Sequence, residues 1–68
     1  MTSGKKLKTT LASLKGCHAD FETFALETEN QVSKQMFSQF ADQTKSMVEG
    51  LESRVKEVEE QEPQYQGR

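Results

Sequence analysis

The stretch FETFALETENQVSKQMFSQFADQT, residues 21–44, decides the fold of this 68-residue chain. It contains the pattern Phe-x-x-Phe-Ala-x-x-Thr twice, at residues 21–28 and 37–44, and the two copies hold all four phenylalanines. Spacings of three, four and seven residues place side chains on one side of an α-helix. The pattern therefore predicts two helices whose apolar sides meet beside a turn.

A first helix is predicted over about residues 3–28, because its apolar positions follow alternating steps of four and three residues. This is the spacing of a coiled-coil seam, the line along which two helices touch. The seam positions are Leu7, Leu11, Leu14, His18, Phe21, Ala25 and Thr28.

The turn is predicted at about residues 29–31, where the chain is polar. Asn30 suits two roles there, a left-handed residue that ends the first helix or the N-terminal cap of the second. The second helix covers residues 32–61 and stops before Pro63, because proline cannot continue a helix. Residues 63–68 are expected to form a flexible tail, in which Tyr65 is either a docking residue or simply disordered.

No β pattern competes, so we expect an all-α fold, an antiparallel two-helix hairpin over residues 1–62. Folding the chain back at Asn30 pairs residues whose numbers sum to about 58, such as Phe21 with Phe37. The four phenylalanines then form one cluster near the turn.

Charge favours the same antiparallel arrangement. Residues 1–20 carry four lysines and one aspartate, whereas residues 45–68 carry six glutamates and four cations. Each distribution opposes the dipole of its own helix, but the two compensate when the helices lie side by side.

One hairpin has little apolar volume, since Leu, Val and Phe together number thirteen and Ile is absent. The second helix also outruns the first by about one turn, which leaves Val55 and Val58 without full partners. We therefore expect self-association, most simply as a homodimer that forms a four-helix bundle; a tetramer or a different partner helix meets the same need. The predicted self-association core is Leu7, Leu11, Leu14, Phe21, Phe24, Phe37, Phe40, Met47, Val48, Leu51, Val55 and Val58.

Composition indicates the cellular compartment of the protein. Cys17 is the only cysteine, which excludes an internal disulfide and fits a reducing, intracellular compartment. The first lysines are not followed by an apolar run long enough for a signal peptide or a membrane span, so we expect a soluble chain without membrane insertion.

A metal site is the main chemical alternative. Cys17 and His18 adjoin, and Glu22 lies one turn after His18. Zinc takes four ligands, so one chain supplies a partial set unless two copies combine. The competing interpretation is that His18 packs at the edge of the seam and Cys17 acts as a small buried hydrophobe.

A nucleic-acid interface is the second alternative and rests on Lys5, Lys6, Lys8 and Lys15. A solvated helix face that complements glutamates explains these lysines better in an acidic chain, so nucleic-acid binding is not favoured. There is no Ser-His-Asp set, no phosphate-binding glycine loop and no inward carboxylate pair. We therefore expect no enzyme activity, no catalytic residue and no cofactor.

Four segments carry a resemblance to a known family: LASLKG at 11–16, FALETENQ at 24–31, LESRV at 51–55 and EPQY at 62–65. With these in order, the chain resembles the family called domain of unknown function 1657 over essentially its full length. It departs at its end, where residues 66–68 read Gln-Gly-Arg in place of Lys-Gly-Phe.

The resemblance implies a context rather than a reaction. The family consists of small proteins of spore-forming Firmicutes, often encoded beside components resembling the channel that moves dipicolinic acid. It implies no catalytic residue. We accordingly expect a non-enzymatic, self-associating structural or adaptor protein of spore formation or spore resistance. The expected location is the cytoplasm of the forespore or spore, with a spore membrane protein as a candidate partner.

Overall fold

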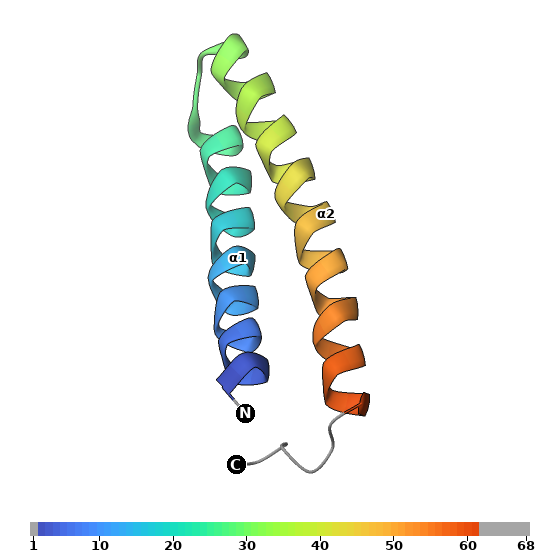
Figure 1. Cartoon of the computed structure of the whole chain (residues 1–68). Helices are drawn as coiled ribbons and strands as arrows, with labels where there is room; N and C mark the ends of the chain where they lie inside the picture. Colours follow the sequence, from blue (N-terminus) through green and yellow to red (C-terminus); the bar gives the residue numbers. More distant parts are fainter. Residues whose placement is uncertain (1, 62–68) are drawn as a thin grey trace.

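The computed structural model describes residues 2–61 as an antiparallel pair of helices, α1 (Thr2–Glu27) and α2 (Gln31–Gln61), joined by a three-residue loop (Figure 1). No strand occurs in this part of the chain. The prediction of an all-α helical hairpin is confirmed. The predicted tail at 63–68, including Tyr65, lies outside the described residues.

The loop is organised around Asn30. The backbone N–H of Ser33 donates to Asn30 Oδ1 at 2.9 Å, and the N–H of Lys34 donates to the Asn30 carbonyl at 2.9 Å. Asn30 therefore caps the N-terminus of α2, which decides between its two predicted roles. Thr28 prolongs the end of α1, since its N–H donates to the Phe24 carbonyl at 3.0 Å.

The Lys34 side chain crosses from α2 to the end of α1. Its Nζ donates to the Ala25 carbonyl at 2.8 Å in a partly buried contact. The last turn of α1 has no basic residue of its own, so this ammonium supplies the positive charge that a helix C-terminus favours. One hydrogen bond thus fixes the two helices relative to each other beside the loop.

The register of the helices corrects the predicted one. The closest rings are Phe21 with Phe40, at 5.3 Å between centroids, and Phe24 with Phe37, at 5.4 Å. Both pairs of residue numbers sum to 61, whereas the predicted pair Phe21 and Phe37 lies at 6.5 Å. The reason is the loop, which rises along the axis so that the first turn of α2 lies beyond the end of α1 (Figure 1).

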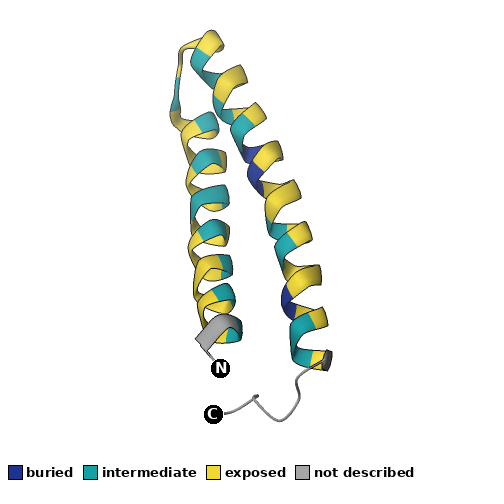
Figure 2. Ribbon diagram, in the orientation of Figure 1, coloured by how far each residue is buried: buried dark blue, intermediate teal, exposed yellow. Residues whose placement is uncertain are grey.

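The buried residues of the described chain all belong to α2. Ala41, Thr44 and Val55 are buried, with 7%, 5% and 8% exposure, on the side of α2 towards α1 (Figure 2). The expectation that Val55 lacks a full partner is therefore wrong, because the shifted register brings α1 opposite it. Thr44 is satisfied within its own helix, since its hydroxyl lies 2.9 Å from the Phe40 carbonyl and 3.0 Å from that of Ala41.

The open end of the hairpin, opposite the loop, follows the same register. A Cβ placed on Gly4 would lie 3.9 Å from Val58 Cγ1, so the helices remain in contact there. Val58 is half-buried, and so it too gains cover from α1. The other half-buried members of the predicted core are Leu7, Leu11, Leu14, Phe21, Phe37, Phe40, Val48 and Leu51, while Phe24 and Met47 are exposed.

Candidate self-association surface

One side of the seam is closed by ion pairs. Lys8 Nζ contacts Glu59 Oε2, and Lys15 Nζ lies 3.0 Å from Glu52 Oε2. The predicted compensation between the lysines of the first helix and the glutamates of the second is confirmed. Because these side chains are largely solvated, each pair stabilises the hairpin by about 0–1 kcal/mol and serves mainly to fix its orientation. We call this side the ion-paired face.

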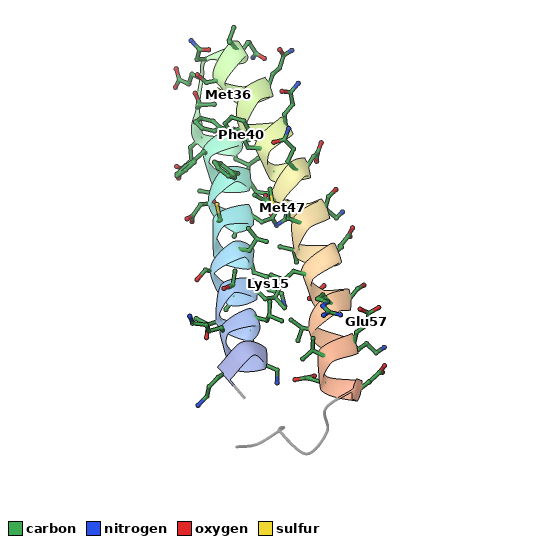
Figure 3. The ribbon with its side chains drawn as sticks, viewed as in Figure 1. Lys15, Met36, Phe40, Met47 and Glu57 are labelled. Atoms are coloured by element: carbon green, nitrogen blue, oxygen red, sulfur yellow. The ribbon has the colours of Figure 1, made fainter. Side chains whose placement is uncertain are left out.

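The other side of the seam is apolar. Phe24 lies nine residues after Lys15, which is a half-turn around α1, and Cys17 lies seven residues before Phe24 on the same side. On α2, Met36, Phe40 and Met47 recur at near-helical spacing (Figure 3). We call these five residues, Cys17, Phe24, Met36, Phe40 and Met47, the apolar face.

The apolar face exposes more hydrophobic surface than a small folded domain needs to. Phe24 is 44% exposed, Met36 41% and Met47 52%. Beside the loop, Phe24 and Phe37 line an open, shallow depression together with Glu27 and Thr28. Exposed apolar side chains that gather on one side of a molecule are a feature of interaction sites.

The four phenylalanines form one connected cluster at the loop end, as predicted. Phe21 lies at its centre, with centroids 6.3 Å from Phe24, 6.5 Å from Phe37 and 5.3 Å from Phe40. Such pairs stabilise by about 0.5–1.5 kcal/mol beyond their burial. Phe24 is the ring of the cluster that is exposed to solvent. The cluster is therefore packed at the seam and uncovered on the apolar face.

The candidate metal ligands are not brought together within one chain. His18 Nε2 lies 3.6 Å from Glu22 Oε2, but Cys17 and Glu22 are five residues apart, or about 140° around the helix. Within residues 2–61, no group of three or more metal-ligating side chains exists. Cys17 is a free, half-buried thiol on the apolar face.

The candidate nucleic-acid residues are divided between two roles. Lys8 and Lys15 are paired with glutamates of α2, which reduces the charge they can offer to a phosphate. Lys5 and Lys6 are exposed near the open end. Two of the four lysines are thus accounted for by the hairpin itself.

The comparison with protein families finds a match. The model of a family described as a protein of unknown function, DUF1657, matches residues 7–55. The chain belongs to the DUF1657 family. No curated protein and no solved structure matches it.

The DUF1657 match covers the loop and the apolar face. It runs from Leu7 in α1 to Val55 in α2, and so includes the loop and the whole apolar face. The family description assigns no activity, ligand or residue role. Within the described part of this DUF1657 chain, no helix is long and apolar enough to cross a membrane.

Proposed function

We propose that this DUF1657 protein is a non-enzymatic helical protein that associates with a second copy of itself through the apolar face. In this role it acts as a structural or adaptor component. The observation that carries the proposal is the contrast between the faces: ion pairs close one side of the seam, whereas Phe24, Met36 and Met47 are exposed on the other.

The small core of one hairpin supports association. Three described residues are buried and none is below 2% exposure, so a single chain removes little apolar surface from water. Small domains of this kind usually need a metal, disulfides or oligomerisation. Full burial of a Phe or Met side chain stabilises by about 1.5–3 kcal/mol, and covering these half-exposed ones contributes about 1 kcal/mol each.

The dimensions of the face suit a second copy. The Cα trace extends over 50 × 16 × 12 Å. A face of 50 by 16 Å offers on the order of 800 Å² per copy, the area that each partner buries in an interface of standard size. Two hairpins stacked in this way form a four-helix bundle, a common solution for paired amphipathic helices.

The biological setting of the proposal comes from the resemblance to proteins of spore-forming bacteria. We place the protein inside the forespore or spore, in spore formation or resistance, with a spore membrane protein as its candidate partner. Deletion of the gene is expected to lower the heat resistance of spores without slowing vegetative growth. Full resistance of the deletion strain would remove the spore role and leave self-association untouched.

Sedimentation equilibrium tests self-association. The wild-type chain is expected to be a dimer at micromolar concentration, and Met47→Glu is expected to be a monomer, because a carboxylate would be buried at the interface. Leu26→Glu is the matched control. Leu26 is 82% exposed and lies eighteen residues, or five turns, after Lys8, so it belongs to the ion-paired side.

The control variant is expected to remain a dimer. A folded wild-type monomer at these concentrations would refute the proposal. Equal loss of the dimer in Met47→Glu and Leu26→Glu would show that the apolar face is not the interface. Circular dichroism of each variant checks that helix content is retained.

A further inference from the structure

We infer that the second copy docks on the apolar face in antiparallel orientation, with the loop end of one hairpin over the open end of the other. This inference rests on the proposed self-association. It is carried by the charges at the two ends of the apolar face, which are opposite in sign and equally far from its middle.

Lys6 marks the open end of the face. It lies eighteen residues before Phe24, which is five full turns, so the two side chains leave α1 on the same side. Glu27 marks the loop end, where it lines the shallow depression with Phe24. A cation and an anion therefore stand at opposite ends of the α1 edge of the apolar face.

Cys17 stands midway between these charges. Lys6 lies eleven residues before Cys17 and Glu27 ten residues after it. At 1.5 Å per residue, the two charges are about 15–17 Å from Cys17 along the helix. A two-fold axis that crosses α1 at Cys17 therefore places Lys6 of each copy over Glu27 of the other, forming two ion pairs.

The parallel arrangement forms no such ion pair. It would lay α1 on the second copy's α2 with both loops at the same end. In the register of this hairpin, Lys6 then faces the level of Arg54, which lies five turns after Met36 and so belongs to the same face. Arg54 is already paired with Glu57 at 3.3 Å, so Lys6 gains no partner there. Glu27 would lie level with Lys34, whose ammonium is already bonded to the Ala25 carbonyl.

Electrostatics sets the orientation because burial does not. A full overlap covers the same apolar residues in either orientation, and the hydrophobic effect has no direction. Charged groups at the margin of an interface, in contrast, fix register and reject wrong arrangements. The two Lys6 and Glu27 pairs therefore decide between two dimers of similar area.

Disulfide trapping tests the orientation. All variants carry Cys17→Ser, and diamide oxidises each pair of thiols to a disulfide by taking up two electrons and two protons. A mixture of Lys6→Cys and Glu27→Cys is expected to give a mixed disulfide in high yield. In the mixed dimer the disulfide replaces one of the two Lys6 and Glu27 pairs. The other pair keeps its native charges.

The matched control is a mixture of Lys6→Cys and Arg54→Cys, which is expected to give little product. The reverse result, with the Lys6 and Arg54 mixture linked, would overturn the antiparallel orientation. If sedimentation shows a dimer in that case, only the orientation has failed. If sedimentation shows a monomer, the proposed self-association has failed with it.

Charge reversal supplies a second readout without cysteines. Lys6→Glu and Glu27→Lys are each expected to weaken dimerisation by about tenfold at low salt, and the double variant is expected to restore it. Lys5→Glu is the control, because it makes the same charge change about 100° around α1. Additive weakening in the double variant would contradict the pairing.

Discussion

The two faces of this hairpin differ in how favourably water solvates them. On the ion-paired face, Lys15 and Glu52 meet at 3.0 Å and remain about half exposed, a state that water tolerates well. On the apolar face, Phe24 and Met47 are as exposed but have no polar group to hydrate. The ion-paired face exposes one large apolar side chain, Leu26, whereas the apolar face exposes Phe24, Met36 and Met47, so the apolar face gains more from a partner.

The largest expected effect comes from a ring at the seam between the two faces. Phe21→Ala removes the centre of the four-phenylalanine cluster, and we expect a loss of about 2–4 kcal/mol in unfolding free energy. Urea denaturation followed by circular dichroism measures it. Leu26→Ala is the control, since its 82% exposed side chain predicts a change within about 0.5 kcal/mol. Equal effects of the two substitutions would contradict the cluster as the core.

A substitution that stabilises the helix outside the interface separates the effect on folding from the effect on dimerisation. Gly16 is helical, and a Cβ placed on it meets no atom within 4 Å. Gly16→Ala is expected to raise the unfolding free energy by about 1 kcal/mol, because glycine is a poor helix former. Thermal denaturation checks it. The dimer dissociation constant should stay the same, and a large change in it would place Gly16 inside the interface.

Loss of the hydrogen bond between Lys34 of α2 and the end of α1 is expected to change the unfolding free energy slightly less. Lys34→Met keeps the aliphatic part of the side chain but removes the hydrogen bond to the Ala25 carbonyl. We expect a loss of about 0.5–1 kcal/mol, the usual value for a cation at a helix C-terminus. Lys45→Met, at an exposed position of α2, is the control. A loss in the control equal to that in Lys34→Met would show that general charge, not this bond, is responsible.

The smallest effect is expected on the ion-paired face itself. Lys15→Ala removes the contact with Glu52, and the unfolding free energy should fall by less than about 1 kcal/mol. The difference should shrink further in high salt, which screens exposed charges. Chemical denaturation at two salt concentrations measures both. A loss as large as that of Phe21→Ala would mean that the two faces are not different in kind.

Periodicity was sufficient to predict the two helices and the phenylalanine cluster. It could not predict the register, because the rise of the loop along the axis depends on backbone angles that spacing does not encode. The difference is one turn, and it is enough to bury Val55 and to leave Met47 52% exposed. A repeat of three and four residues defines the centre of the apolar side of a helix. Phe24 and Met47 lie at the edges of that side.

The contact of Lys34 was missed for a different reason. A lysine in the first turn of a helix opposes that helix's own dipole, so local rules treat it as unfavourable. Its use becomes clear only when the end of α1 is seen beside it, without a basic residue of its own. Asn30 was the opposite case, because both of its possible roles could be foreseen and the hydrogen bond from Ser33 decided between them.

The most direct test of the central claim is the alkylation rate of Cys17 as a function of protein concentration. If a second copy covers the apolar face, this rate should fall as the concentration rises. A cysteine on the ion-paired side, Leu26→Cys in a Cys17→Ser background, should react at a constant rate. A Cys17 rate that does not change across the range, or an equal fall at both positions, would contradict the account.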